Sequence, residues 1–351
     1  MAEISVEERE DGFGLLFGDA RSSDGDTRDE ASPALEEEQY TRPQRLPLEA
    51  GAGARSTAVP PTLTLSLVSS RHSLWGHRLW NAALLLAEMI DEEEIIVEGK
   101  SVLELGAGAG LPSLICALRG AKKVVISDYA TSTDEALMVP IQINIDRVQP
   151  EFVSEDTLHA VGHVWGHGVE DLLVPLGTTA VREDPRADNG GGEDDVGGEE
   201  SPVPRNGVAP GGGEASLGGG GGGGGEKKLL ASKRALEAGG GGAAQGGFDV
   251  VIMADLLFNR SQHAQLLETC DRCLRRKGSG SDADAGTVWV SFSHHDPEKA
   301  ELDMKFFALA TEKGFVATRI KTVQMRDLFV ENDGMDGLRG EVHLWCLKRQ
   351  G

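Results

Sequence analysis

Three glycines at alternate positions follow a short apolar stretch of the chain. They are Gly106, Gly108 and Gly110, within the segment VLELGAGAGLPS at 102–113. A glycine-rich turn between a strand and a helix lets the backbone approach a nucleotide closely. The dinucleotide-binding pattern requires glycine at the position of Leu111, and the phosphate-binding loop requires a Gly-Lys-Ser/Thr sequence that the turn lacks. The turn therefore indicates a nucleoside-binding site that is neither a dinucleotide site nor a phosphate-binding loop.

Two acidic residues accompany this turn. Glu104 lies two positions before the first glycine, and Asp128 ends the next apolar stretch. A carboxylate at the end of the second strand of such a unit can accept both hydroxyls of a ribose. No lysine or arginine lies between Lys100 and Arg119 to bind a phosphate, and the carboxylate of Glu104 would attract an ammonium group. S-adenosylmethionine has no phosphate but carries a sulfonium and an amino group, so we predict it as the cofactor.

Further polar residues follow two later apolar stretches. Asp255 ends the stretch FDVVIMAD, and His294 with His295 end the stretch GTVWVSFSHH. The paired histidines could orient a substrate or could simply be solvated loop residues. Cys270 and Cys273 form a single C-x-x-C within a helical pattern, and because no second pair accompanies them, we predict no metal site.

The elements that must position these residues alternate between strands and helices. We expect strands at 62–68, 100–106, 122–129, 158–165, 248–255, 286–295, 315–323 and 341–348. We expect helices at 79–90, from about 112 to 120, and at 134–147, 263–276 and 298–314. This order predicts an α/β fold with a parallel sheet, helices on both faces and a C-terminal antiparallel hairpin. It matches the Rossmann-like, seven-stranded sheet of class I methyltransferases better than a dehydrogenase domain.

Composition divides the 351 residues into a domain and two unusual segments. Residues 1–60 are acidic, and we predict a loosely ordered N-terminal arm there. The domain, 61–351, is interrupted at about 178–247 by a glycine-rich insertion that we expect to be disordered. The formal charge of −23 argues against nonspecific nucleic-acid binding, and no apolar run is long enough to span a membrane. We expect a cytoplasmic monomer with reduced cysteines.

Five segments in order resemble the family-16 lysine methyltransferases. They are LWGHRLWNA, VLELGAGAGLPS, VVISDY, HVWG and DLLFNRSQH, and the resemblance covers about 60–175 and 247–349. Within the family the chain looks most like the branch, once named nicotinamide N-methyltransferase-like, that methylates translation elongation factor 1A at its N-terminal glycine and adjacent lysine. The resemblance thus implies a protein N-methyltransferase that uses S-adenosylmethionine and takes elongation factor 1A as its substrate.

The resemblance also implies roles for individual residues. It assigns cofactor-binding roles to Trp80, Gly106, Ala107, Gly108, Asp128, Trp165 and Ala254. Trp80 would line the cofactor site, Asp128 would bind the ribose and Trp165 would lie beside the adenine. Asp255 and Phe258 form the acid-x-x-aromatic pattern that lies beside the target amine in the family. The carboxylate would bind the ammonium form of the amine, and the ring would offer a π face to the cationic methylated product.

Three other functions remain open from the residues. A small-molecule N-methyltransferase acting on nicotinamide or a related amine would need a closed apolar pocket. A non-catalytic sheet domain that binds cofactor or partner as a scaffold would not need the acidic residues to be intact. An NAD-dependent dehydrogenase is disfavoured by Leu111 and by the lack of a second domain.

Overall fold

The computed structural model describes residues 34–43, 60–69, 76, 78–131, 134–177, 246–277, 285–326 and 340–350. The predicted insertion at about 178–247 lies outside these residues except for its last two positions, and most of the predicted arm lies outside them as well.

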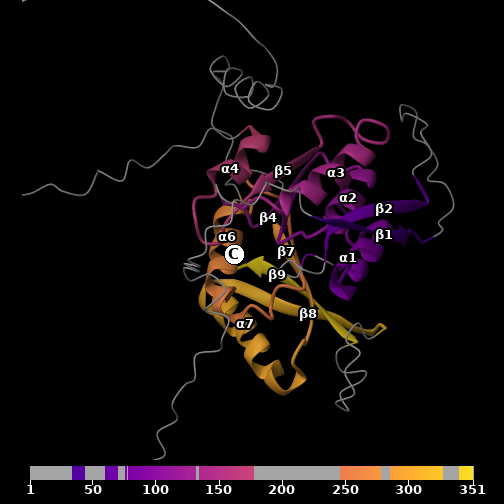
Figure 1. Ribbon diagram of the computed structural model, residues 1–351. Coiled ribbons are helices and arrows are strands. Elements are labelled where there is room, and N and C mark those ends of the chain that lie inside the picture. Colours follow the sequence, from indigo (N-terminus) through magenta and orange to yellow (C-terminus); the bar gives the residue numbers. More distant parts are fainter. Residues whose placement is uncertain are drawn as a thin grey trace, which may run out of the picture. The chain divides into compact units, whose positions relative to one another are not determined.

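A seven-stranded sheet forms the centre of the described domain (Figure 1). Its strand order is β5-β4-β3-β6-β7-β9-β8. The strands are β3 (Ser101–Leu105), β4 (Lys123–Asp128), β5 (Leu158–Gly162), β6 (Val250–Ala254), β7 (Thr287–Ser293), β8 (Phe315–Gln324) and β9 (Glu341–Arg349). The first five strands in the order are parallel, whereas β9 is antiparallel to both β7 and β8. This topology confirms the predicted α/β fold and its C-terminal antiparallel pair.

Helices cover both faces of the sheet (Figure 1). One face carries α1 (Asn81–Asp91), α2 (Leu111–Leu118) and α3 (Met138–Val148), and the other carries α4 (Glu170–Leu173), α6 (His263–Cys273) and α7 (Ala300–Glu312). Short 3-10 turns are η1 (Val174–Leu176), η3 (Arg260–Gln262) and η4 (Pro297–Lys299). Alternate residues of a strand enter the two cores: Val250 and Ile252 of β6 pack on one side, Val251 on the other. Burial on both faces explains why these strands are apolar throughout.

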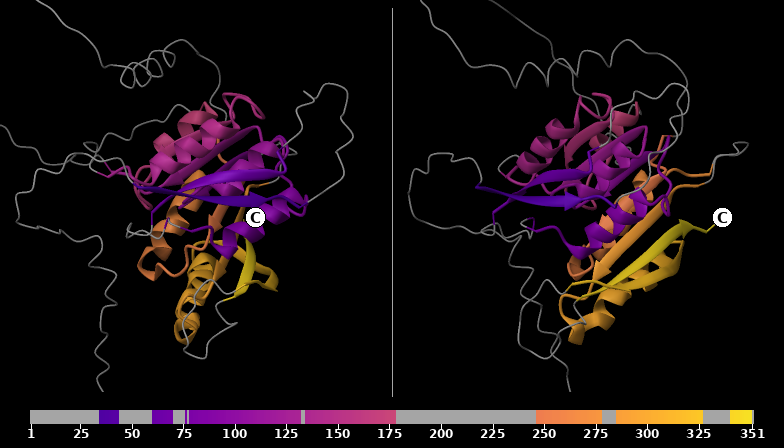
Figure 2. Two further views of the ribbon diagram at one scale, coloured as in Figure 1. Left: turned by 45° about the vertical axis from the view of Figure 1, so that its right-hand side comes forward. Right: turned by 90° about the vertical axis from the view of Figure 1, so that its right-hand side faces the viewer.

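A two-stranded antiparallel ribbon lies alongside the first helical face (Figure 2). Its strands are β1 (Leu35–Thr41) and β2 (Thr62–Val68), and β2 has the predicted boundaries. The strand β1 lies in the segment predicted to be a loosely ordered arm, so that prediction was wrong for residues 35–41. Three consecutive glutamates give this segment a weak strand propensity, but the full ladder with β2 and the burial of Tyr40 supply what the local sequence lacks.

Several predicted strands are shorter than expected, and the structure gives a local cause for two of them. The strand expected at 158–165 ends at Gly162, because its partner β4 ends at Asp128 and the last ladder bond runs from His163 N–H to the Asp128 carbonyl. The strand expected at 248–255 ends at Ala254, because Asp255 has a left-handed φ of 60°. Among the described helices, none is long and apolar enough to cross a membrane.

Candidate functional site

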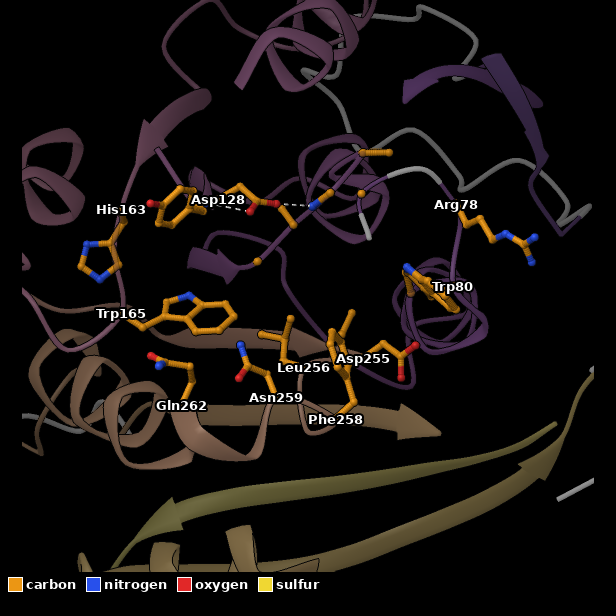
Figure 3. A pocket seen from close by; sticks show the side chains of 18 of the residues that line it. Arg78, Trp80, Asp128, His163, Trp165, Asp255, Leu256, Phe258, Asn259 and Gln262 are labelled. Carbon is orange, nitrogen blue, oxygen red and sulfur yellow. Dashed lines mark hydrogen bonds between the residues drawn. The ribbon is translucent and has the colours of Figure 1, made fainter. Parts of the chain in front are cut away.

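A cavity of about 330 Å³ opens where β3, β4 and β6 end, at the carboxyl edge of the parallel strands. The structure brings all the predicted site residues except Glu104 to its wall. They are Trp80, Gly106, Ala107, Gly108, Asp128, Trp165, Ala254, Asp255 and Phe258. Figure 3 shows His163, Trp165 and Gln262 at one end and Trp80, Asp255 and Phe258 at the other.

The glycine turn forms the floor of the cavity between β3 and α2. Gly106, Gly108 and Gly110 all have positive φ values, 60°, 55° and 74°, which side chains rarely adopt. Ala107 N–H donates to the Ser127 carbonyl over 3.0 Å, which fixes the turn to β4. A Cβ added at Gly108 would meet no atom within 4 Å and would instead occupy the space above the turn. The glycine there keeps room for a ligand.

The carboxylate of Asp128 lies at the centre of the cavity edge. Its Oδ2 accepts the Gly108 N–H over 2.6 Å, and its Oδ1 accepts the Tyr129 N–H over 2.7 Å. A carboxylate can accept about four hydrogen bonds, so these two contacts are compatible with the predicted ribose role. Asp128 also couples the position of the turn to the end of β4, a role that the sequence did not reveal.

Glu104 lies beneath the turn rather than on the cavity wall. Its side chain is fully buried, and its Oε2 accepts the Ser113 N–H over 3.0 Å at the start of α2. Burial, followed by the nearby charge of Asp128, raises the pKa of Glu104 to about 8 although the Ser113 bonds favour the charged form. The structure thus corrects the expectation that Glu104 faces an ammonium group at the entrance of the turn.

One end of the cavity is aromatic and amide-rich. Trp165 lies beyond the end of β5, in a loop that is tied to α6 because Gly166 N–H donates to Thr269 Oγ1 over 2.9 Å. His163 lines the same end, and burial lowers its pKa to about 4, so its ring is neutral near pH 7. An indole beside neutral polar groups suits a flat heterocycle such as adenine.

The sequence reasoning missed several residues at this end. His163, Asn259, Gln262 and Gln265 all line the cavity. His163 follows a predicted strand directly, so the rule that ligands bind at the carboxyl ends of parallel strands could have found it. The three amide side chains come from the turn and helix after β6. Asn259 and Gln262 lie within the quoted segment DLLFNRSQH, but no role was assigned to them, and no local pattern marks Gln265.

The other end of the cavity is framed by Trp80 and Phe258. Trp80 is the N-cap of α1 rather than a residue inside the helix, and its half-buried ring lines the cavity. Phe258 is also half-buried there, which distinguishes both rings from plain core residues. Two aromatic faces at this end can stabilise a cation.

Asp255 contacts the end of β7. Its Oδ1 accepts the Ser293 N–H over 3.1 Å, and its Oδ2 lies 2.9 Å from His295 Nε2. Neither of the two histidines named from the sequence is among the residues that line the cavity, and His294 contacts Asp303 Oδ2 over 2.8 Å. The structure therefore separates the pair and brings only His295 to Asp255.

The C-x-x-C cysteines do not line the cavity. Cys270 and Cys273 are fully buried residues of α6, and burial raises the pKa of Cys273 to about 12. Within the described part of the chain, no three His, Cys, Asp or Glu side chains are placed to hold a metal ion.

The residues of the cavity fit the predicted cofactor. Gly108 leaves room above the turn, Asp128 offers a carboxylate beside it, and Trp165 offers an aromatic face at the far end. In the described lining Arg78 is the single lysine or arginine, so there is no cluster of such side chains for phosphates. These features suit a nucleoside joined to an amino acid better than a nucleotide.

Comparison with known proteins agrees with this reading. A family profile described as lysine methyltransferase matches residues 61–175. A Schizosaccharomyces pombe protein named "Protein N-terminal and lysine N-methyltransferase efm7" is 30% identical over 284 residues, which cover 81% of this chain and 81% of that protein. Proteins of the same name from Cryptococcus neoformans (31% identical; 81% and 75% covered) and Candida glabrata (28% identical; 93% and 98% covered) are similar along most of their lengths.

The profile match includes the glycine turn and Asp128, and the pairwise similarity continues through β6 and its loop. Profile, relatives and cavity thus agree on an enzyme that uses S-adenosylmethionine. This chain belongs to the lysine methyltransferase family.

Proposed function

We propose that this methyltransferase modifies a protein, translation elongation factor 1A, at the amine of its N-terminal glycine and at the adjacent lysine. The observation that carries the proposal is the 30% identity, over 81% of both chains, to a relative named for N-terminal and lysine methylation. The five motifs that resemble the branch acting on elongation factor 1A support the choice of substrate.

The places of the site residues in the cavity support the roles that the resemblance implies. S-adenosylmethionine, when bound, supplies a methyl group activated by its sulfonium. Asp128 would hold the ribose, the backbone of Gly106, Ala107 and Gly108 would contact the methionine part, and Trp165 would lie by the adenine. Holding two reactants in a fixed orientation can by itself lower a barrier by several kcal/mol.

The target amine must lose its proton before it can accept a methyl group. An α-amino group has a pKa near 7.7 and loses its proton readily, whereas lysine, near 10.4, requires an environment that disfavours its charge. Trp80 and Phe258 would desolvate the amine and lower its pKa, and they would offer π faces to the methylated cation. Asp255 lies at the same end of the cavity and supplies a negative charge.

A labelling experiment tests this function. Purified protein is incubated with methyl-labelled S-adenosylmethionine and elongation factor 1A whose N-terminal glycine is free, and the labelled peptides are identified by mass spectrometry. We expect label on the N-terminal amine and on the adjacent lysine. Label in nicotinamide or other small amines, with none in the protein, would support the small-molecule alternative instead, and no transfer to any substrate in a cell extract would support the scaffold alternative.

A further inference from the structure

Asn259 is a buried polar residue of the cavity wall whose side chain does not serve the local backbone. It is the N-cap residue of η3, a position at which asparagine commonly accepts a hydrogen bond from a backbone N–H of the first turn. Here the side chain makes no capping bond. The residue is only 6% exposed, and Figure 3 shows its side chain pointing into the cavity on the side of Trp165. The amide is therefore available to a ligand.

A neighbouring hydroxyl fixes which end of this amide faces the cavity. Ser261 Oγ donates to Asn259 Oδ1 over 3.1 Å, so the oxygen is held toward the turn. The Nδ2 group makes no hydrogen bond to any residue that the structure describes, and protein atoms do not enclose it on all sides. A buried amide donor without a partner costs free energy, and an acceptor on a bound ligand removes that cost.

The groups around Asn259 suit a heterocycle rather than the target amine. Gln262 lines the same end of the cavity, and His163 there is neutral near pH 7 because burial lowers its pKa to about 4. The Asp255 carboxylate, which suits a cation, lies at the other end. An ammonium group carries only donors, so it cannot accept from Nδ2, whereas ring nitrogens of adenine are acceptors. The atom that Nδ2 matches is therefore a ring nitrogen of the base.

We propose that Asn259 Nδ2 donates a hydrogen bond to a ring nitrogen of the adenine of S-adenosylmethionine, and that Ser261 is the positioning residue that orients this amide. The proposal rests on the proposed place of the adenine beside Trp165, and it does not depend on which amine is methylated. All nucleosides share the ribose that Asp128 would hold, and an indole face can stack on any flat base. Asn259 therefore adds selectivity for adenine.

Calorimetric titration with S-adenosylhomocysteine, the product form of the cofactor, tests this hydrogen bond without a methyl acceptor. We expect Asn259→Ala to raise the dissociation constant about tenfold, as for one hydrogen bond. Asn259→Asp keeps the shape but offers no donor, so it should lose at least as much, whereas a packing role would leave it near wild type. The urea midpoint of Asn259→Ala should stay at the wild-type value, because the side chain makes no capping bond. Gln142→Ala, which removes an exposed amide of α3, is the control and should keep wild-type affinity.

Deaza analogues of S-adenosylhomocysteine identify the acceptor. In these compounds a C–H group replaces N1, N3 or N7 of the adenine, one at a time. The wild-type protein should bind one of the three about tenfold more weakly than the parent compound, and Asn259→Ala should bind that analogue and the parent equally well. An affinity of Asn259→Ala within twofold of wild type, or losses of the same size in both proteins for all three analogues, would overturn the proposal.

Trp165→Ala separates this inference from the proposed place of the adenine. If Trp165→Ala weakens the binding of S-adenosylhomocysteine and Asn259→Ala does not, only the role of Asn259 fails. If neither substitution weakens binding, the adenine does not lie beside Trp165, and both assignments fail. A raised KM for the protein substrate in Asn259→Ala, with unchanged cofactor affinity, would place Asn259 at the substrate instead.

Discussion

At the scale of single residues, the two acids beside the glycine turn have different surroundings. Glu104 directly precedes the turn and Asp128 ends the next strand, β4, yet Asp128 lines the cavity and Glu104 is buried below the turn. The alternation of β3 explains the difference. Leu103 and Leu105 enter one core, and Glu104 points to the opposite face, where α2 begins and Ser113 N–H bonds to it.

The buried carboxyl of Glu104 makes stability depend on pH. Its pKa is about 8 in the fold against an ordinary value of 4.5, so the folded state binds more protons than the unfolded state between these values. The free energy of unfolding should therefore fall as pH rises from about 4.5 to 8, by a few kcal/mol at most. We expect Glu104→Gln to remove this loss, as measured by urea unfolding at pH 5 and pH 8. Parallel pH dependences in variant and wild type would contradict the assignment.

The ribose role of Asp128 is tested by cofactor affinity. We expect Asp128→Ala to raise the dissociation constant for S-adenosylmethionine about a hundredfold, since two hydrogen bonds to a charged group are worth roughly 3 kcal/mol or more. Calorimetric titration measures the change, and Asp146→Ala, at an exposed position of α3, is the control. An affinity within twofold of wild type would remove the ribose assignment.

At the scale of elements, the turn between β3 and α2 joins backbone geometry to the shape of the cavity. A Cβ at Gly106 would come 2.6 Å from Leu256 Cδ2 and 3.0 Å from Trp165 Cζ2, and both of those side chains line the cavity. A Cβ at Gly99, with a similar φ of 70°, would meet no atom within 4 Å. The two positions share backbone strain and differ only in contact with the cavity wall.

This pair of glycines gives a controlled prediction. Gly99→Ala and Gly106→Ala should both lose about 1–2 kcal/mol of unfolding free energy, because each places a side chain at positive φ. Only Gly106→Ala should weaken cofactor binding, by about tenfold or more, since Leu256 and Trp165, which line the cavity, must shift to make room. Thermal unfolding and calorimetric titration measure the two effects. Equal affinities in the two variants would show that the wall tolerates the added methyl group.

Periodicity and turn residues predicted most elements of the fold because their signals are local. The apolar strands around β3, β4 and β6 and the glycine turn all lie where the sequence placed them. The acidic strand β1 was missed because its stability comes from pairing with β2, which the sequence of β1 does not encode. For the same reason the amides of Gln262 and Gln265 and the His295–Asp255 contact were not predicted, since they depend on how separate elements pack.

At the scale of the whole described domain, one buried side chain connects three parts of the structure. Asn144 of α3 accepts the Ser66 N–H over 2.7 Å and donates to the Ser66 carbonyl over 2.9 Å. It also donates to the carbonyl of Ala109, in the glycine turn, over 3.0 Å. The ribbon, the helix and the floor of the cavity are thus joined by a residue that is 1% exposed. Arg42 joins the same ribbon to α1 through Asp91, with Nε 2.7 Å from Oδ2.

Loss of Asn144 should therefore affect stability and cofactor binding together. Asn144→Ala leaves buried backbone groups of Ser66 and Ala109 without partners, at about 1–3 kcal/mol each, so we expect a loss of roughly 3 kcal/mol or more in unfolding free energy. Because Ala109 lies in the cavity floor, affinity for S-adenosylmethionine should also fall.

Arg147→Ala is the matched control, since exposed Arg147 joins the same helix to the same ribbon through Thr64 and Glu37. Its loss should cost less than about 1 kcal/mol and leave affinity unchanged. Equal effects of the two substitutions, in urea unfolding and titration, would show that the buried connection does not couple the ribbon to the cavity.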